Sequence, residues 1–376
     1  MVNTDRMLSE FLELVRIDSV SGSEREIADL LIKKLKELNL EVFEDKTGSI
    51  INTGTGNIIA RLPGEGSGKN RPAVMVCAHM DTVEPGRGVS PVVENGIVRS
   101  SGDTILGGDD KAGVAIILEA IRVIRECCLD HCEIEVVLTV FEEGGLKGAA
   151  NIDTGLLKAR IGYVLDSDDP PGTIITKAPT QDRITAVIKG RSAHAGICPE
   201  KGINAIEVAA KAIAGMRLGR IDSDTTANIG VISGGKATNI VPDSVLVEGE
   251  TRSTVQSKKE AQTLHMLGEI DRAVKEYGAS SEVKVENLYR EFNLDESEEV
   301  VRIAVDAAGR LGLNPVLKAT GGGSDANMFN EKGIPTVVLG IAMQNVHTTD
   351  EYISVEEMEK GCRYLVEIIK CAAGIE

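Results

Sequence analysis

A histidine and an aspartate follow an apolar segment early in the chain. Residues 73–77 (Ala-Val-Met-Val-Cys) predict a buried strand, and His79 and Asp81 come next in Ala-His-Met-Asp-Thr-Val. In an open α/β sheet, side chains at the carboxyl end of a strand emerge into the crevice where ligands bind. Imidazole nitrogens and carboxylate oxygens are ligands for divalent metals. The pair therefore indicates a metal site, although taken alone it is also typical of an ordinary loop histidine.

Four further acidic or histidine side chains occupy the same kind of position later in the chain. They are Asp109, which opens an apolar helical segment in Gly-Gly-Asp-Asp-Lys-Ala-Gly, and Glu143, Asp166 and His347, each of which follows a strand-like apolar run. The carboxyl ends of parallel strands meet at one edge of a sheet. We expect these four side chains and His79 to converge on one crevice, because packing alone does not explain five polar residues in such positions.

The residue types match a pair of divalent metal ions. Two imidazoles and three carboxylates can hold two ions if one carboxylate bridges them, which leaves each ion three protein ligands and an open position for water. We expect His79, Asp109 and Asp166 to bind one ion. We expect Asp109, Glu143 and His347 to bind the other. Zinc is the expected metal, and cobalt and manganese suit the same ligands.

Two carboxylates beside the ligands have chemistry of their own. Glu142 is adjacent to the ligand Glu143 and is left free to take a proton from the bridging water, as a general base must. Asp81 is spaced to hydrogen-bond the far nitrogen of His79 and so to fix the tautomer of that ligand. Both are therefore predicted to belong to the catalytic machinery.

The acidic run that begins at Asp166 leaves one ligand open. Its sequence is Asp-Ser-Asp-Asp-Pro-Pro, so Asp168 and Asp169 also lie near the predicted strand end. We expect Asp166 to bind the metal, because it is the residue at the end of the strand. Asp168 is the alternative, and Asp169 is expected to be a solvated turn residue before the prolines.

Five ordered motifs carry a family resemblance. The segments Ala-His-Met-Asp-Thr-Val, Gly-Gly-Asp-Asp-Lys-Ala-Gly, Glu-Glu-Gly-Gly and Leu-Asp-Ser, followed by a late histidine, extend over nearly the whole chain. In this order they resemble the di-zinc aminoacylase and carboxypeptidase G superfamily, and within it the peptidase T-like branch of tripeptide aminopeptidases. The resemblance implies Asp109 as the bridging ligand, followed by a cis peptide bond, and Glu142 as the general base. The acidic run at 166–169 departs from peptidase T, in which one aspartate is followed by glycines.

The residues and the resemblance together predict a metallo-aminopeptidase. It would release N-terminal residues from tripeptides by attack of a di-zinc-bound hydroxide on the peptide carbonyl, with Glu142 as the base. An N-acyl-amino-acid amidohydrolase or a dipeptidase on the same metal core is the alternative. A metal-binding scaffold without turnover is disfavoured, because Glu142, the residue that such a protein could most readily lose, is present.

The resemblance also implies roles for residues outside the metal site. His194, in Ser-Ala-His-Ala-Gly, matches a histidine that reaches a catalytic cleft, often that of the partner subunit, and stabilises the carbonyl oxygen as it gains negative charge. Asn239 and Arg252 match positions that hold substrate carboxylate or carbonyl groups in relatives. Without the resemblance, these would be an ordinary loop histidine and two strand-end residues. The resemblance further implies a homodimer formed through the domain that carries them.

A second glycine-rich loop precedes a helix near the end of the chain. In Gly-Gly-Gly-Ser-Asp-Ala-Asn, at 321–327, exposed backbone N–H groups could hold an anionic end of a substrate. Gly322 and Ser324 are the residues expected to do so. The alternative is a tight helix entry and nothing more.

The order of the predicted elements divides the chain into two domains. Strands and helices alternate over 1–179 and 292–376, which predicts a mostly parallel α/β sheet flanked by helices, of the zinc-exopeptidase type. Between them, at 180–291, the order strand, helix, two strands, helix, strand predicts an inserted α+β ferredoxin-like domain with lid and dimerisation roles. The catalytic domain is discontinuous because His347 must return to the site of the early motifs. A capping box formed by Ser23 and Glu26 is expected to open one of its helices.

Composition excludes several classes of partner. The chain has 376 residues, of which 42% are apolar, and this is enough for two domains with real cores. A net charge of −17 speaks against nucleic acid or an anionic membrane as a partner. No run approaches the roughly 18 apolar residues of a membrane span, and the first residues lack the apolar core of a secretory signal.

The cysteines and the remaining histidines point to a reducing compartment and to no second site. Seven cysteines at irregular spacing fit reduced thiols in a cytoplasmic protein better than a disulfide framework. The cluster at 127–132 is not expected to bind metal, because no partner cluster exists elsewhere in the sequence. His131 and His265 are expected to face solvent.

Overall fold

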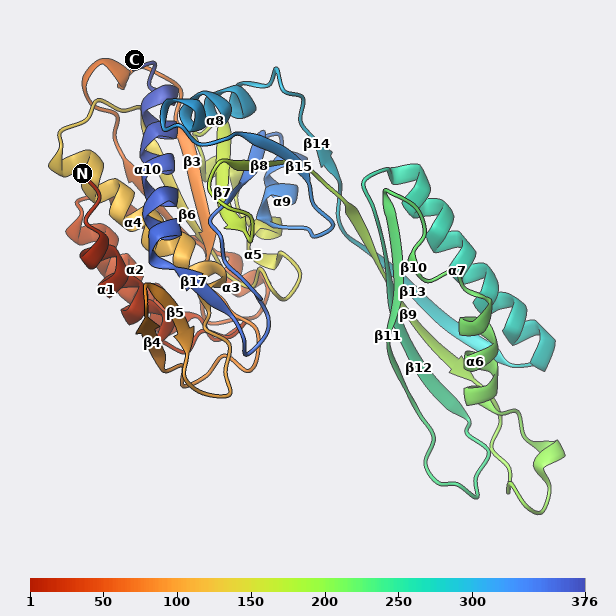
Figure 1. Cartoon of the computed structure of the whole chain (residues 1–376). Helices are drawn as coiled ribbons and strands as arrows, with labels where there is room; N and C mark the ends of the chain where they lie inside the picture. Colours follow the sequence, from red (N-terminus) through yellow and green to blue (C-terminus); the bar gives the residue numbers. More distant parts are fainter. Residues whose placement is uncertain (376) are drawn as a thin grey trace. The chain divides into compact units, whose positions relative to one another are not determined.

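The computed structural model describes residues 1–375, and these form two compact units. The first unit comprises residues 1–176, 294–319 and the described residues from 324 onward, and the second comprises residues 177–293 and 320–323. The first unit contains both described ends of the chain (Figure 1). The short segment 320–323 groups with the second unit, which the sequence did not anticipate.

A nine-stranded sheet forms the centre of the first unit. Its strand order is β1-β2-β6-β3-β7-β16-β8-β14, with β15 beside β8. The neighbours β6, β3, β7 and β16 run parallel, whereas β2 and β8 join them antiparallel on either side. The strands are β1 Glu41–Glu44, β2 Ile58–Leu62, β3 Val74–His79, β6 Ile134–Thr139, β7 Ile161–Ser167, β8 Thr173–Ala178, β14 Phe292–Asn293, β15 Val316–Ala319 and β16 Thr336–Gly340. The predicted α/β class with a mostly parallel central sheet is confirmed.

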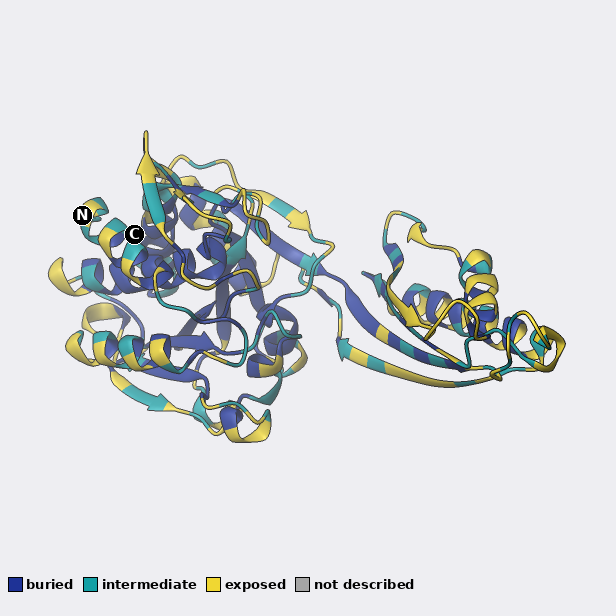
Figure 2. Cartoon of the chain, turned by 90° about the horizontal axis from the view of Figure 1, so that it is seen from below, coloured by how far each residue is buried: buried dark blue, intermediate teal, exposed yellow. Residues whose placement is uncertain are grey.

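Helices cover both faces of this sheet. One group packs into the large core together with Val74, Val76 and Ala78 of β3; it consists of α1 Thr4–Val15, α2 Arg25–Glu37, α4 Gly108–Glu126, α8 Glu299–Arg310 and α10 Val355–Ala372. A second group contains α3 Thr47–Ile50, α5 Lys147–Asn151 and α9 Asp325–Glu331, of which α9 contacts β7 and β16. Because side chains alternate along a strand, His79 at the end of β3 points away from the first group. The dark blue strands in Figure 2 show how completely the helices bury the sheet.

A small sheet lies outside this frame and was not predicted. It contains the hairpin β4 Pro91–Glu94 and β5 Ile97–Ser100, with β17 Tyr352–Ser354 paired antiparallel to β5. The pairing holds the segment that follows His347 against the segment that precedes Asp109. It therefore ties together two parts of the chain that carry predicted ligands.

The second unit is a five-stranded antiparallel sheet with two helices. Its elements are β9 Thr180–Lys189, α6 Ala205–Gly215, β10 Gly219–Arg220, β11 Thr225–Gly234, β12 Ser244–Ser253, α7 Gln256–Tyr277 and β13 Ser280–Tyr289. The strand order β10-β11-β12-β9-β13 places β9 and β12 at the centre, as in a ferredoxin-like fold. Apolar side chains from α6, α7 and the inward-facing positions of the strands make a separate core.

Two local predictions are wrong. The helix α2 has Glu24 as its N-cap and no side-chain capping bond, so the capping box expected from Ser23 and Glu26 does not form. His131 is only 2% exposed, and its Nδ1 lies 2.7 Å from the carbonyl oxygen of Cys132, so it does not face solvent.

No helix within residues 1–375 is both long and apolar enough to cross a membrane.

Candidate metal centre

The five predicted ligands converge in the first unit. Nε2 of His79 lies 3.0 Å from Oδ1 of Asp109 and 4.0 Å from Oδ1 of Asp166. Nε2 of His347 lies 3.1 Å from Oδ2 of Asp109 and 2.8 Å from Oε1 of Glu143. Each oxygen of Asp109 therefore faces a different imidazole, which is the arrangement that a carboxylate bridging two cations requires.

The parallel strands explain why these side chains meet. In the register of the sheet, His79 of β3 is level with Thr139 at the end of β6, and Cys77 is level with Val164 of β7. Two residues further along, His79 and Asp166 therefore stand side by side on the same face. The turn after β6 carries Glu143, so the neighbouring strand ends supply three of the five ligands.

A tight glycine turn presents Asp109. Gly107 has φ of +74°, a left-handed conformation that L side chains rarely adopt. A Cβ atom on Gly108 would lie 3.0 Å from Oε1 of Glu351, so the absence of a side chain at Gly108 leaves room for this carboxylate. The Asp109–Asp110 peptide bond is cis, as the family resemblance implies.

The hydrogen bonds of His79 differ in one detail from the prediction. Nδ1 of His79 lies 2.9 Å from the backbone carbonyl oxygen of Asp81, whereas the Asp81 carboxylate is 3.6 Å away. The carbonyl, not the carboxylate, is thus the acceptor that fixes the ring. The carboxylate is engaged elsewhere, because its oxygens accept the N–H groups of Glu142 at 2.8 Å and Glu143 at 3.2 Å and the hydroxyl of Ser21.

The ionisable groups of the cluster shift one another's pKa values. Hydrogen bonds to Asp109 and Glu143 raise the pKa of His347 to about 10, although burial opposes the shift. Burial would raise the pKa of Asp109, but the hydrogen bonds from His347 and His79 hold it below its usual range. Burial is the largest cause of the raised pKa values of Glu142 and Asp166. A divalent cation would therefore displace protons from the imidazoles, as is usual when such ligands bind metal.

The donor set fits one or two divalent cations. Within residues 1–375, two groups of potential ligand atoms lie within 4.8 Å of one another, namely His79, Asp109 and Glu143, and His79, Asp110 and Asp166. The oxygens of Asp110 already accept the N–H groups of Gly113 at 3.1 Å and of His79 at 3.3 Å. The Asp110 oxygens are thus occupied by backbone donors, whereas each Asp109 oxygen faces an imidazole.

The structure distinguishes among the carboxylates of the acidic run. Asp166 is partly buried beside His79, whereas Asp168 is exposed. Asp169 is not merely solvated, because both of its oxygens contact Nζ of Lys318, at 2.8 and 2.9 Å. Asp166 is thus the member of the run that reaches the cluster.

Four other predicted site residues belong to the second unit and not to the unit that contains the cluster. They are His194, Asn239, Arg252 and Gly322. His194 is exposed, and its Nδ1 accepts the N–H group of Gly196 at 3.2 Å. The guanidinium of Arg252 contacts both oxygens of Glu250, at 2.9 and 3.1 Å.

Ser324 has a structural role that the sequence left as the alternative. Its hydroxyl accepts the N–H group of Ala326, and the Asn327 side chain accepts the N–H group of Ser324, so the pair forms a capping box at the start of α9. Ser324 and Asn327 thus form a helix entry in the first unit, whereas residues 320–323 of the same loop group with the second unit. Only 8% of Ser324 is exposed.

Sequence reasoning missed four buried charged groups near the cluster. They are Glu24, Lys111, Asp325 and Glu351, of which none is more than 1% exposed. Burial raises the pKa of Asp325 to about 6 and lowers that of Lys111 to about 8. Asp325 accepts the hydroxyl of Thr139, and Lys111 donates to the carbonyl of Ile17. Lys111 and Asp325 lie in glycine-rich segments, and a charge there is a signal that could have drawn attention to them. Glu24 and Glu351 carry no such local signal.

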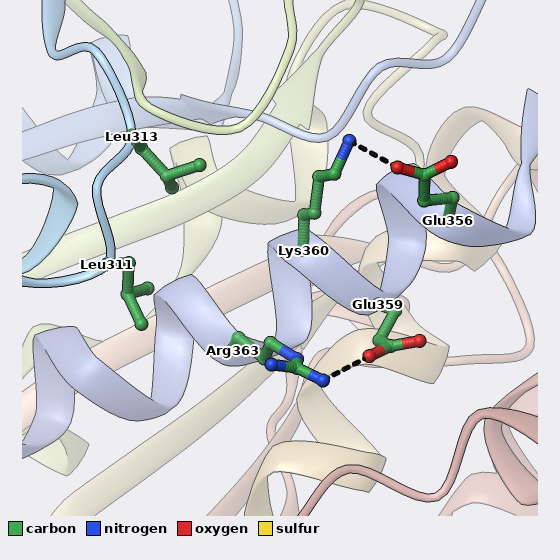
Figure 3. A pocket seen from close by; sticks show the side chains of 6 residues that line it. All are labelled: Leu311, Leu313, Glu356, Glu359, Lys360 and Arg363. Carbon is green, nitrogen blue, oxygen red and sulfur yellow. Dashed lines mark hydrogen bonds and ion pairs between the residues drawn. The ribbon is translucent and has the colours of Figure 1, made fainter.

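A hollow of about 320 Å³ lies on another part of the first unit (Figure 3). Leu311 and Leu313 form one wall, and the other is formed by α10. The charges along α10 are already paired, Lys360 with Glu356 and Arg363 with Glu359. None of its lining residues is a predicted ligand, so we assign it no part in the chemistry.

Comparison with known proteins places the chain in a peptidase family. Residues 75–370 match the model of peptidase family M20/M25/M40, and the chain belongs to this family. It is 47% identical over 373 residues to the uncharacterized protein YqjE of Bacillus subtilis (strain 168), covering 99% of this chain and 100% of that protein.

Two solved structures are also similar over their full length. The aminopeptidase PepT of Bacillus cereus ATCC 10987 is 46% identical, with a TM-score of 0.89 and 99% of each chain covered. A tripeptidase of Staphylococcus aureus subsp. aureus Mu50 is 41% identical, with a TM-score of 0.94 and 100% of each chain covered. The resemblance to the peptidase T-like branch is thus confirmed by relatives named aminopeptidase PepT and tripeptidase.

The two candidate aspartates of the acidic run provide a matched test of the metal centre. We expect Asp166→Ala to weaken zinc binding at least about 10-fold, because a ligand is lost. Asp168→Ala should leave the affinity unchanged, since that carboxylate is exposed and outside the cluster. Competition titration with a chromogenic chelator measures both. Equal losses in the two variants, or a loss in Asp168→Ala alone, would contradict the assignment.

Proposed function

We propose that the protein is a metal-dependent aminopeptidase that releases N-terminal residues from tripeptides. The observation that carries this proposal is the Asp109 carboxylate, which faces His79 with one oxygen and His347 with the other, beside the buried Glu142. Membership of a peptidase family supports hydrolysis. The relatives named aminopeptidase and tripeptidase support the choice of substrate.

The proposed ligands are His79, Asp109, Asp166, Glu143 and His347. Two divalent ions held there would polarise the peptide carbonyl and lower the pKa of the attacking water. Zinc is the metal proposed, because the set combines two imidazoles with three carboxylates; cobalt and manganese accept similar ligands.

Glu142 moves the proton in the proposed reaction. Glu142 is 8% exposed, and burial raises its pKa, which brings a carboxylate closer to the range where it both accepts and returns a proton at neutral pH. It would take a proton from the attacking water and deliver it to the leaving nitrogen. Asp81 contributes by holding the N–H groups of Glu142 and Glu143, which orients the turn that carries the base.

We further propose that the second unit mediates a homodimer and supplies His194 to the reaction. Apolar side chains are exposed on this unit, among them Ile206 at 41%, Val231 at 44% and Ile232 at 52%. β10 pairs with β11 only at Ala227 and Thr226, so the rest of that edge of β11 is open among the described strands. Open edges and exposed apolar side chains are typical of surfaces that another chain covers.

His194 would stabilise the carbonyl oxygen as negative charge develops on it. Asn239, Arg252, Gly322 and Ser324 are proposed to bind the ends of the substrate. Arg252 would do so together with its partner Glu250, and Ser324 through the backbone that it caps.

All seven cysteines are free, which suits the cytoplasmic location that we propose.

Replacing the base separates chemistry from binding. We expect Glu142→Gln to lower kcat by about 100-fold to 10,000-fold, because the amide cannot accept the proton. Zinc content should not change, since Glu142 is not a ligand. Steady-state kinetics with a free tripeptide, together with metal analysis of the same preparation, measures both. Full activity in this variant would overturn the assigned mechanism.

Blocking the substrate amine distinguishes the proposed activity from the N-acyl alternative. A free tripeptide should be hydrolysed rapidly, whereas its N-acetylated form should be hydrolysed at least about 10-fold more slowly, because an aminopeptidase site is complementary to the free amine. Product release is followed by chromatography of both peptides under the same conditions. Preferential hydrolysis of the acetylated peptide would instead identify an amidohydrolase.

Mixed dimers test whether His194 acts across subunits. His194→Ala and Glu142→Gln should each be nearly inactive alone. After random subunit exchange between equal amounts of the two variants, about half of the dimers are mixed and each contains one intact site, so we expect about a quarter of the wild-type activity. Light scattering checks that the preparations are dimeric. No recovery on mixing, or a fully active monomer, would contradict the proposal.

A further inference from the structure

Two buried carboxylates that are not proposed ligands hold the turns that carry the reactive groups. Glu351 contacts the turn that presents Asp109, and Glu24 contacts the turn that presents Glu142. Both are almost fully buried, Glu24 at 0% and Glu351 at 1% exposed. Buried carboxylates are costly unless hydrogen bonds compensate them, so their partners indicate what they do.

Glu351 accepts three backbone N–H groups from one turn. Its Oε2 accepts those of Leu106 and Gly107, each at 2.8 Å, and its Oε1 accepts that of Asp109 at 3.0 Å. Gly107 is in a left-handed conformation, and Gly108 leaves room for the carboxylate. The backbone N–H group of Asp109 and those of the two residues at the start of the turn are thus held by one carboxylate.

Glu24 and Asp81 together accept hydrogen bonds from the turn that carries Glu142. Oε1 of Glu24 accepts the N–H groups of Gly22 at 2.8 Å and Phe141 at 3.1 Å. Asp81 accepts the next two N–H groups, those of Glu142 and Glu143. Consecutive N–H groups from Phe141 to Glu143 are therefore all held by carboxylates.

This turn needs such support because of its conformation. Phe141 has φ of +55°, in the left-handed region that is unfavourable for a bulky side chain. The hydrogen bond from its N–H group to Glu24 acts on the residue directly before the base. Within residues 1–375, Oε2 of Glu24 has no hydrogen-bond partner, so Oε1 carries the whole interaction.

We propose that Glu24 and Glu351 are positioning residues with separate tasks. Glu351 sets the place of Asp109 and so controls cation affinity, whereas Glu24 sets the place of Glu142 and so controls proton transfer. The inference rests on the proposed function for the task of Glu24. For Glu351 it concerns cation binding, which can be measured without any substrate.

The chain offers a matched control in Glu135. This glutamate is also 0% exposed, and its Oε2 likewise accepts two backbone N–H groups, those of Lys158 and Ala159, each at 2.8 Å. It lies near the amino end of β6, whereas the ligands follow the carboxyl ends of the strands. Its removal should lower stability without a selective effect on metal or on chemistry.

The test compares Glu24→Ala, Glu351→Ala and Glu135→Ala by zinc titration and steady-state kinetics on protein shown to be folded by circular dichroism. We expect Glu351→Ala to weaken zinc binding by about 10-fold to 100-fold. Glu24→Ala should keep its zinc affinity and its KM but lose about 100-fold in kcat, since small misplacements of a reacting group are costly. Glu135→Ala should lower only the melting temperature.

Conservative variants guard against simple unfolding. Glu24→Gln keeps an oxygen in the place of Oε1 and should restore most of kcat, while Glu351→Gln retains only part of its acceptors and should show an intermediate zinc affinity. The proposal is overturned if both alanine variants behave like Glu135→Ala, or if Glu24→Gln is as impaired as Glu24→Ala. A wild-type protein that binds zinc tightly but cleaves no peptide would instead refute the proposed function. Zinc titration of Glu351→Ala would still test whether Glu351 controls cation affinity.

Discussion

The site depends on the position of a single carboxylate. Asp109 lies between two imidazoles that come from distant parts of the sequence, His79 at the end of β3 and His347 after β16. Its distances to both are near 3 Å, so a small displacement would lengthen one contact or the other. The sheet register, the glycine turn and the acceptor Glu351 all act on this one placement. The rest of the proposed chemistry follows from it.

The same placement concentrates negative charge in a buried region. Asp109, Glu142, Glu143 and Asp166 lie close enough to affect one another's pKa values. Like charges at low dielectric repel strongly, and burial adds a desolvation cost. Protons on the imidazoles offset part of this in the free protein, and divalent cations would offset more. An arrangement that is unfavourable for stability would thus give the centre an affinity for cations.

The sequence revealed the parts of the site that local pattern determines. Candidate ligands at strand ends, such as His79 and Asp166, stand out because a polar residue follows a buried run, and the alternation of predicted strands and helices indicated the fold class. Residues whose role comes from tertiary contact did not stand out. Glu24 and Glu351 accept backbone N–H groups from segments far away in the sequence, which no local pattern encodes. Asp81 was predicted to bond His79 through its carboxylate. In the structure its backbone carbonyl contacts His79, and its carboxylate accepts the N–H groups of Glu142 and Glu143.

The most direct test of the account is anomalous diffraction from crystals grown with zinc. Two peaks are predicted, one contacted by His79 and Asp166 and the other by Glu143 and His347, with Asp109 touching both. A single peak that does not contact Asp109, or full occupancy at a site elsewhere in the molecule, would contradict the central claim.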